Sequence, residues 1–576
     1  MESLSAAPVL RLSELKLPLD HSQADLEEAI CRQLAISPSQ LLGHRLVKRS
    51  VDARRRGAIA LVYSLDLELA LDAAGLRRLQ RRFGDDPHLR PTPDHRYQVV
   101  ARFSSPPPGP RPVVVGAGPC GYFAALLLAQ MGLRPLLLER GQPVKRRTAD
   151  TFGFWSGRLP FNPESNAQFG EGGAGTFSDG KLYSQVSEPD ALIRKVLEEL
   201  VAAGALPEIL TAHRPHIGTF KLATVVRGLR ARIMDLGGEV RFGAKLTGLD
   251  LEPDSRAVRG VWLADGSRVA TDQLVLALGH SARDSFAMLR DQGVALEPKP
   301  FAVGLRIEHP QPLIDRARWG SAAGHPQLGA AEYKLVHHSP SGRSAWSFCM
   351  CPGGLVVGAT SEPGAVVTNG MSQHSRNERN ANSALVVNVE AADLAGWGES
   401  PDDPLAGVAF QRHWERQAFL AGGGDYSAPA QWLGDFLAGR SSGGSEVPKG
   451  AVDGSCRPGL RFTDLEGCLP AWVLATLREA LPAFERTIPG FCDPGALLTG
   501  VETRTSSPVR IRRERESLES PNTPGLYPAG EGGGYAGGIL SAAIDGIRVA
   551  EAVAVALKRR LPPSPGGQDG SVCDPA

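Results

Sequence analysis

The segment VVVGAGPCG, residues 113–121, is the strongest indication of fold class in this chain. Three valines predict a short buried strand, and Gly116, Gly118 and Gly121 lead into an apolar stretch with helical character. At this spacing the first glycine permits a tight turn, the second lets the backbone approach a pyrophosphate, and the third allows close packing of helix on strand. The pattern predicts an α/β fold that opens a doubly wound sheet and binds a dinucleotide.

The acidic residue expected in such a fold follows at the right place. LLLE, residues 136–139, reads as the next buried strand, and Glu139 closes it 18 residues beyond Gly121. The start of the intervening helix favours negative phosphates, and the carboxylate can accept hydrogen bonds from both hydroxyls of an adenosine ribose. A turn in an unrelated α/β fold is the alternative interpretation.

The other end of the chain carries a second glycine turn. In LYPAGEGGGYAGGIL, residues 526–540, a strand ends at Gly530, Glu531 follows, and further glycines lead into a helix whose N-terminus can face a ligand. A simple NAD-binding domain needs no such element. For Glu531, a helix N-cap carboxylate is the alternative role.

These motifs together resemble the glutathione-reductase-like flavoproteins with two dinucleotide domains. More specifically, the chain resembles a bacterial family of uncharacterised FAD-dependent dehydrogenases, also described as NAD(FAD)-utilising oxidoreductases. The resemblance extends from the N-terminal module to about residue 550. It rests on strings such as NAQFGEGGAGTFSDGKL (166–182), HRPHIGTFKL (213–222), KPFAVGLRIEHP (299–310) and AGEGGGYAGGI (529–539).

The resemblance implies FAD as cofactor, with NAD(P)H as a possible transient electron donor. It implies that Glu531 contacts the ribityl-phosphate part and that Gly538 to Leu540 approach the isoalloxazine ring. QLVLALGH, residues 273–280, resembles a strand of these proteins that ends in the sequence Ala-Thr-Gly, with Leu278 at the position of the threonine. The expected cofactor contacts are Gly116, Ala117, Gly118, Pro119, Cys120, Gly121, Glu139, Arg140, Gly173, Gly175, Thr176, Leu246, Gly279, Gly530, Glu531, Gly538, Ile539 and Leu540.

The glycine-rich segment 169–182 suggests a second wall of the site. Gly172, Gly173, Gly175 and Thr176 are expected to offer backbone N–H groups to a phosphate or to the flavin ring. Lys181 is expected near the flavin N1–C2=O locus, where its charge would stabilise the anionic reduced ring. A surface lysine is the alternative.

Several polar residues are candidates for catalysis or substrate binding. Cys349 and Cys351 lie on one side of a predicted strand, either as a redox dithiol or as small buried residues. Arg306, Glu308 and His309 form one polar group, in which Arg306 and Glu308 are alternatively a structural ion pair. A second group is Arg376, Asn380 and Asn382. His280 is expected to orient the ring or donate a proton, or else to be structural.

The domain organisation follows from composition shifts. The Pro-rich stretch at 104–112 separates a small α/β module from the dinucleotide fold, and mixed strands interrupt that fold. Residues 395–449, rich in Gly, Ser and Asp, are expected at the surface. The predicted fold is a Rossmann-like FAD-binding domain with an inserted mixed α+β substrate or cap domain and a small N-terminal α/β module. The expected parts are 1–103, 104–112, 113–294, 295–490, 491–560 and a disordered tail at 561–576.

Composition limits the classes of partner. The 63 Lys and Arg residues against 62 Asp and Glu give a formal net charge of +1, which argues against a nucleic-acid partner. The basic stretch 44–56 is the one local hint of polyanion binding, and a solvated hairpin face is its alternative. Eight scattered cysteines without a CxxC pair suit the cytoplasm. No metal is expected at His213 and His216, and no membrane insertion is expected.

The predicted function is an FAD-dependent oxidoreductase, a dehydrogenase or reductase that transfers a hydride through flavin N5 to or from a small-molecule substrate. Without a second GxGxxG, a nicotinamide donor would use the same flavin face as the substrate. Two alternatives remain. One is an RNA-associated flavoprotein that supports nucleic-acid modification, and the other is a partner-binding protein with structural FAD.

Overall fold

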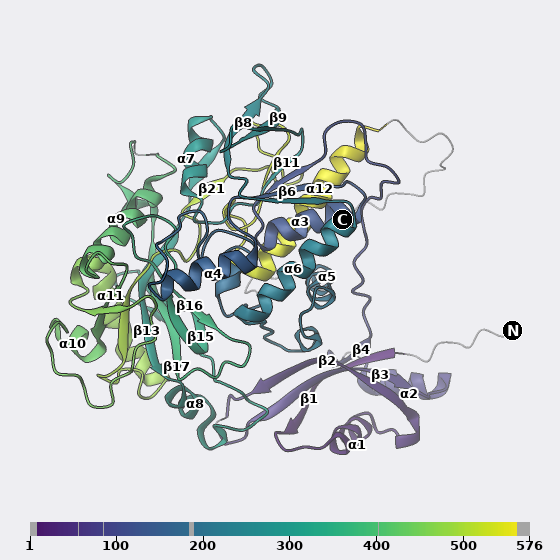
Figure 1. Ribbon diagram of the computed structural model, residues 1–576. Coiled ribbons are helices and arrows are strands. Elements are labelled where there is room, and N and C mark those ends of the chain that lie inside the picture. Colours follow the sequence, from purple (N-terminus) through teal and green to yellow (C-terminus); the bar gives the residue numbers. More distant parts are fainter. Residues whose placement is uncertain (1–8, 56, 85, 184–188, 401, 562–576) are drawn as a thin grey trace.

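The computed structural model describes residues 9–55, 57–84, 86–183, 189–400 and 402–561 (Figure 1). These residues form an N-terminal module, a central domain with a parallel sheet, and a region inserted into it that has a large mixed sheet. The expected disordered tail lies outside the described residues, apart from Leu561.

The central domain confirms the predicted Rossmann-like fold. Its sheet is parallel throughout, and the strand order places the first glycine turn at the middle of the sheet. The strands, in spatial order, are β22 (Leu526–Pro528), β11 (Leu274–Leu276), β5 (Val113–Val115), β6 (Leu136–Glu139) and β7 (Glu239–Phe242).

Alternation along these strands divides two apolar cores. Val114 packs with helices on one face of the sheet, whereas Val113 and Val115 pack on the other face. The first face is covered by α3 (Pro119–Gln130), α5 (Asp190–Ala202), α6 (Thr219–Asp235) and α12 (Ile539–Arg559). The second face meets β8 (Leu246–Leu251), β9 (Val258–Leu263), β10 (Arg268–Ala270), α7 (Arg283–Asp291), β12 (Leu296–Pro298) and β21 (Val509–Ile511).

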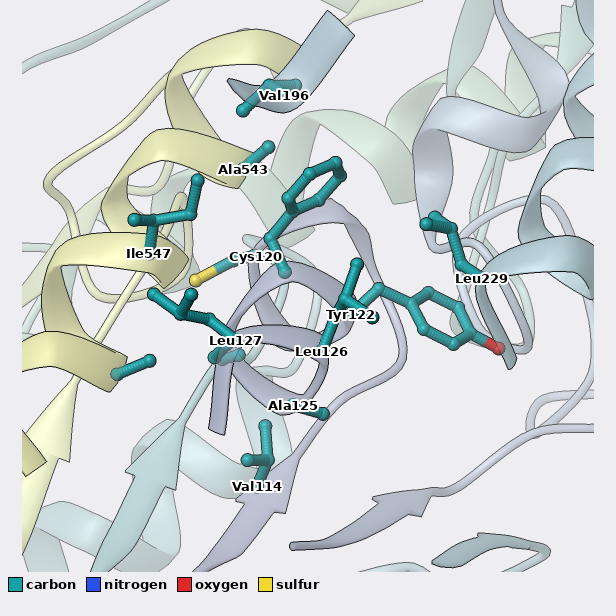
Figure 2. Packing of buried hydrophobic residues seen from close by; sticks show 14 of the residues in the cluster. Val114, Cys120, Tyr122, Ala125, Leu126, Leu127, Val196, Leu229, Ala543 and Ile547 are labelled. Carbon is teal, nitrogen blue, oxygen red and sulfur yellow. The ribbon is translucent and has the colours of Figure 1, made fainter. Parts of the chain in front are cut away.

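Helices α3 and α12 lie side by side, which sets where both N-termini point. Figure 2 shows Cys120 and Leu127 of α3 directed toward Ala543 and Ile547 of α12, while Tyr122 points to the opposite side. All these side chains are buried, so the two helices are held as one unit. Helix α4 (Val144–Trp155) follows β6 and leads to the glycine-rich segment.

The N-terminal module is a four-stranded antiparallel sheet with two helices. Its βαββαβ order and strand order β2-β3-β1-β4 are those of a ferredoxin-like fold. The predicted hairpin is β2 with β3. The elements are β1 (Val9–Pro18), α1 (Gln23–Leu34), β2 (Leu41–Asp52), β3 (Ala60–Leu69), α2 (Ala73–Phe83) and β4 (Leu89–Pro91).

The inserted region is built on an eight-stranded sheet in the order β14-β15-β17-β13-β20-β18-β19, with β16 paired to β15. Helix α11 packs against β14, β15 and β17. The elements are β13 (Phe301–Pro310), α8 (Gln311–Trp319), β14 (Val336–His338), β15 (Ser344–Gly358), β16 (Thr368–Ser372), β17 (Asn380–Val389), α9 (Ala406–Ala421), β18 (Ala428–Trp432), α10 (Leu433–Ala438), β19 (Leu460–Phe462), α11 (Ala471–Thr487) and β20 (Leu497–Glu502).

Three expectations need correction. Residues 395–449 are not mainly a surface stretch, because α9, β18 and α10 lie there and Phe410 and Phe436 are buried in the inserted core. The stretch EVRFGAKLTGLDL, residues 239–251, is expected from its sequence to return to the parallel sheet, but only β7 does so, and β8 belongs to the small antiparallel sheet with β9 and β10. The expected boundary at residue 490 falls too early, because β20 pairs with β13 up to Glu502.

Candidate cofactor and substrate site

A continuous cavity of about 1880 Å³ lies between the three regions of the chain. Ordinary ligand pockets measure roughly 300–1,000 Å³, so this cavity has room for a dinucleotide and a second molecule. Residues of the central domain, of the inserted sheet and of the N-terminal module all line it.

The first glycine turn forms part of the cavity wall. Gly116 has a φ of +106°, and a Cβ there would stand 2.4 Å from the carbonyl oxygen of Ala277. A Cβ on Gly121 would stand 1.8 Å from the carbonyl oxygen of Gly116, so only glycine allows α3 to start so close to β5. Gly118 lines the cavity, and the nearest atom to a Cβ there would be 3.8 Å away. The N-terminus of α3 is therefore open to a ligand.

Glu139 lines the same wall and also holds the turn in place. Its carboxylate accepts hydrogen bonds from the backbone N–H groups of Ala117 at 2.8 Å, Gly141 at 2.8 Å and Gly170 at 3.0 Å. Each carboxylate oxygen has more than one acceptor site, so a ribose hydroxyl can still donate to it. The sequence predicted the ligand-facing role and missed this structural one.

Arg140 follows Glu139 and is held on the cavity rim. Its guanidinium forms ion pairs with Glu164 at 2.7 Å and Asp284 at 2.9 Å, and it lies 4.0 Å over the ring of Phe169. A planar cationic surface of this kind can stack on an aromatic base.

The second helix N-terminus opens into the same cavity. Gly538 has a φ of +93°, precedes the first residue of α12, and would have open space around a Cβ. Gly538, Ile539 and Leu540 line the cavity. Gly530 serves packing instead, since a Cβ there would lie 2.8 Å from Cβ of Cys120.

Glu531 presents a carboxylate to the cavity without a hydrogen-bond partner among the described residues. Burial raises its pKa to about 7, and nearby Lys299 opposes this shift. Glu531 is half-buried, and a desolvated carboxyl group without a partner is costly, so a ligand hydroxyl or N–H would relieve that cost. Together with the two open helix N-termini, Glu531 makes this cavity fit a dinucleotide cofactor.

The glycine-rich segment is shaped by Arg147, which the sequence did not single out. Its fully buried guanidinium donates to the carbonyl oxygens of Asn166, Ala167, Gly170, Glu171 and Gly173 at 2.8 to 3.1 Å. Burial lowers the pKa of Arg147 to about 10. Because of these five bonds, the segment curls around one side chain.

This arrangement corrects the expected role of the segment's N–H groups. The N–H groups of Gly172, Gly173 and Thr176 donate to the carbonyl oxygens of Ala117, Gly170 and Gly173, respectively, so they are not free for a ligand. Gly173 and Gly175 still line the cavity. A Cβ on Gly175 would lie 3.1 Å from Cγ1 of Ile539, so the segment also packs against the start of α12.

Lys181 lies on the cavity wall between the central domain and the inserted sheet. Its Nζ donates to the carbonyl oxygen of Met350. Burial lowers the pKa of Lys181, but the carboxylates of Glu332 and Asp179 outweigh burial, so the pKa lies above its ordinary value. The ammonium group is therefore charged at neutral pH and has hydrogen-bonding capacity left for a ligand.

Cys349 and Cys351 lie on β15 and both line the cavity as free thiols. The strand bulges between Phe348 and Cys351, and Cys349 has a φ of +42°, so simple alternation does not describe the pair. The side chain of Cys349 is exposed to the cavity, whereas Cys351 is buried. Enclosure by the protein raises the pKa of Cys349 to about 12 and that of Cys351 to about 11, so both are protonated thiols at neutral pH.

His280 lines the cavity beside Ser281. Its Nδ1 lies 3.0 Å from Oγ of Ser281, which also accepts from Arg504 at 2.9 Å. Burial, together with the charges of Arg504 and Arg283, lowers the pKa of His280 to about 3. The imidazole is therefore neutral, and it is oriented by its neighbours rather than poised to gain a proton.

Three candidate catalytic residues do not line the cavity. Arg306 is fully buried and pairs with Glu502 at 2.9 Å, not with Glu308 as the ion-pair alternative supposed. Glu308 instead accepts from Ser455 at 2.5 Å and from Asn380 at 2.9 Å. Both lie on the central strand β13, where neighbouring strands enclose the side chains. Glu502 reaches the cavity in place of Arg306.

Arg376 lies behind the cavity wall and orders it. It forms ion pairs with Asp179 and Glu332, and both of these carboxylates line the cavity. Burial lowers the pKa of Arg376, but the two carboxylates outweigh burial and raise it.

The structure therefore brings most predicted residues to one place. Among the described residues, the predicted ones that line the cavity are Gly116, Gly118, Pro119, Cys120, Glu139, Arg140, Gly173, Gly175, Lys181, Leu246, Gly279, His280, Cys349, Cys351, Glu531, Gly538, Ile539 and Leu540. Those that do not line it are Ala117, Gly121, Gly172, Thr176, Arg306, Glu308, His309, Arg376, Asn380, Asn382 and Gly530.

Among the described residues, no group of three or more His, Cys, Asp and Glu side chains is arranged to hold a metal ion. In the same part of the chain, none of the helices is long and apolar enough to cross a membrane.

Comparison with known families agrees with the geometry. Residues 111–390 match a family model described as FAD dependent oxidoreductase, and residues 300–505 match one described as FAD-dependent protein, C-terminal domain-like. Residues 9–68 match a domain of unknown function. An uncharacterized protein of Clostridium beijerinckii is 44% identical over 549 residues, which cover 94% of this chain and 98% of the relative.

Solved structures with some likeness include CtdE in complex with FAD, at 13% identity and a TM-score of 0.30 over 78% of this chain and 89% of that chain. Glycine oxidase from Bacillus cereus has 9% identity and a TM-score of 0.32 over 78% of this chain and 96% of that chain. None of the comparisons supports an RNA-associated protein or a partner-binding protein with structural FAD.

Proposed function

The chain belongs to a family of FAD-dependent oxidoreductases, and on this basis we propose that it binds a small organic substrate between its FAD and the inserted sheet. When bound, FAD supplies hydride chemistry at its N5 atom. The substrate, an organic molecule or a nicotinamide donor, then meets the cofactor in the same cavity. No dedicated nicotinamide domain is needed for this arrangement.

The main support for the proposal is that one cavity contains both the expected cofactor site and residues of the inserted region. The open N-termini of α3 and α12 line the same cavity as Lys181, Cys349 and other residues of the inserted region. The helix starts and Glu531 suit the phosphates and hydroxyls of the cofactor. The remaining volume, walled by β15 and β16, suits a second molecule beside it.

The protein residues supply charge and shape at the place where the two molecules meet. Lys181 holds a positive charge on this wall, where it favours an anionic group on the ring or on the substrate. Arg376 does not line the cavity, but it pairs with Asp179 and Glu332, which line that wall together with Lys181. His280, neutral and tied to Ser281, acts as a fixed hydrogen-bonding group.

The proposal is tested with the purified full-length protein. An absorbance spectrum should show the flavin band at roughly 450 nm, and anaerobic addition of NADH, NADPH and a panel of amino acids, hydroxy acids and aldehydes should identify a reductant that bleaches it. Complete reduction by one class of donor, on a timescale that stopped-flow absorbance resolves, is expected. A flavin that stays oxidised with every donor, or a protein that takes up no FAD, would falsify the proposal.

A further inference from the structure

One end of the cavity is walled by the N-terminal module rather than by the cofactor-binding domain. Arg11, Arg45, Lys48, Asp66 and Thr92 of this module line the cavity that also contains Gly118 and Lys181. The family model that matches this module carries no function.

The module turns a polar sheet face toward the cavity. Leu65 and Leu67 of β3 are buried in the module's own core, which includes residues of α1 and α2. Asp66, between them, points to the opposite face. Figure 1 shows α1 on the side of the sheet that faces away from the rest of the chain. The helix-free face is therefore the one that meets the cavity.

Cross-strand register places two arginines beside Asp66 on that face. Asp66 of β3 is paired with Arg11 of β1 on one side and with Arg45 of β2 on the other. Its carboxylate accepts from Nε of Arg11 at 2.8 Å, from Nη2 of Arg45 at 2.8 Å and from Oγ1 of Thr92 at 3.2 Å. The Asp66 side chain is only 2% exposed. A buried carboxylate thus holds two guanidinium groups in a fixed row.

The row carries more positive charge than its own carboxylate neutralises. One aspartate faces two arginines, and the side chain of Arg45 is 74% exposed with a single bond to Asp66. Lys48 lies farther along β2 on the same face, opposite Ser64, and has no ion-pair partner among the described residues. Of the acidic residues that line this end of the cavity outside the row, Asp94 pairs with Arg96, Glu198 pairs with Arg194, and Asp190 lies 3.8 Å from His95. Unused guanidinium and ammonium donors therefore face the cavity.

We propose that the helix-free face of the N-terminal module, through Arg45, Lys48 and Arg11, binds an anionic group of the substrate, a carboxylate or a phosphate. The inference rests on the proposed function, because it assigns the charged end of the molecule whose other end meets the flavin. A guanidinium group binds a carboxylate or a phosphate through two parallel hydrogen bonds. Because Asp66 already holds the two arginine side chains in place, they lose less conformational entropy when the anion binds.

A small anion fits this face better than RNA does. Sheet-face RNA-binding modules stack bases on aromatic side chains of the sheet. Here the central strands β1 and β3 present Arg11, Ser64 and Asp66 instead. The face is also turned inward to the cavity, where a long polynucleotide has less room than a single substrate molecule.

The test uses the flavin-loaded full-length protein and isothermal titration calorimetry. Sodium pyrophosphate and sodium tricarballylate serve as phosphate and carboxylate probes, and glycerol serves as a neutral probe. We expect at least one anion to bind, with affinity falling about tenfold in Arg45→Gln and in Lys48→Gln, the size of one charge-assisted hydrogen bond. Arg32→Gln is the matched control, because Arg32 lies on α1 on the far side of the sheet and pairs with Glu28. It should bind as the unmodified protein does.

The probe that binds identifies the anion. Equal affinity in Arg45→Gln, Lys48→Gln and the unmodified protein overturns the proposal, and so does the absence of binding by either anion. Binding of a single-stranded RNA oligonucleotide that displaces both probes also overturns it in favour of nucleic acid. The flavin band is recorded for every sample. A protein that shows the flavin band but binds neither anion contradicts this inference alone. A protein without the flavin band contradicts the proposed function.

Discussion

Gly546 of α12 lies against Cys120 of α3 so closely that a Cβ on Gly546 would stand 2.2 Å from the Cys120 carbonyl oxygen. The two helices whose N-termini open into the cavity are thus packed backbone to backbone at this point. The position of one cofactor-facing helix end depends directly on the other.

Replacing Gly546 by alanine is therefore expected to push α12 away from α3. The free energy of unfolding should fall by about 1–3 kcal/mol, the usual cost of overpacking a core, and FAD should bind less tightly. Urea unfolding and the fluorescence of released flavin measure the two effects. Gly467→Ala is the control, because a Cβ at Gly467 meets nothing within 4 Å. Equal loss of stability in both variants would contradict the packing argument.

Replacing Lys181 by methionine should remove the positive charge from the cavity wall while keeping much of the side-chain volume. Flavin content should be unchanged, and the rate constant for flavin reduction by the donor found above should fall about 10²-fold or more, as when one charge-stabilising donor is lost. Stopped-flow absorbance measures this rate. Lys145→Met, at an exposed position on α4, should react at the unmodified rate. A Lys181→Met enzyme of full activity would show that the lysine is structural.

Protein stability should fall on acidification because of His309. This side chain is 0% exposed, burial lowers its pKa to about 4, and its Nε2 lies 2.7 Å from the carbonyl oxygen of Phe491. Because the folded-state pKa lies below the ordinary value of 6.5, the unfolded chain binds the proton first as the pH falls. The free energy of unfolding begins to fall at about pH 6.5 and decreases by about 2 kcal/mol between pH 7 and pH 5.

Urea unfolding at pH 7 and pH 5 tests this pH dependence. In His309→Gln the difference in the free energy of unfolding between pH 7 and pH 5 should shrink by about 2 kcal/mol. In His338→Gln, at an exposed position, this difference should be the same as in the unmodified protein. An unchanged pH difference in His309→Gln would assign the acid sensitivity to other groups.

Glu415 should be among the most stabilising charged residues of the chain. Its buried carboxylate pairs with Arg283 at 2.7 Å and with Arg504 at 2.8 Å, and thereby joins the central domain to the inserted region. Burial raises the pKa of Glu415, but the two arginines outweigh burial and lower it well below its usual range. Glu415→Gln leaves two buried cations underpaired and is expected to cost about 3–5 kcal/mol.

The control for Glu415 is Arg440→Gln, which breaks an ion pair whose arginine side chain is 70% exposed. Such a pair contributes about 0–1 kcal/mol. Thermal unfolding of both variants with FAD bound measures the difference. A Glu415→Gln protein that unfolds within a degree of the Arg440→Gln protein would disprove the assigned role.

Much of the fold was predictable, because its decisive signals are local. The glycine spacing at 116–121 and the apolar strands around it predict a parallel sheet with an open helix end, and the structure has both. The segment 395–449 was misread, since its Gly, Ser and Asp content masked the apolar positions of α9. Composition reports average polarity, whereas burial depends on which face each side chain occupies.

The candidate site was predictable in part. Residues in turns next to strands, such as Gly118 and Glu531, reach the cavity as the motifs suggest. Arg147 could not be found, because five carbonyl oxygens of a later segment satisfy it and no spacing in the sequence marks such a cluster.

The tight turns and the buried strands can be predicted from the amino-acid sequence alone, because they depend on neighbours within a few residues. The pairing of Arg306 with Glu502 rather than with Glu308, and the ordering of Arg11 and Arg45 by Asp66 on a cavity wall, are set by how the chain folds in space. The difference lies in the sequence separation of the residues that interact. An ion pair forms with whichever charge the folded sheet brings within about 4 Å, and that partner can be any distance away along the chain.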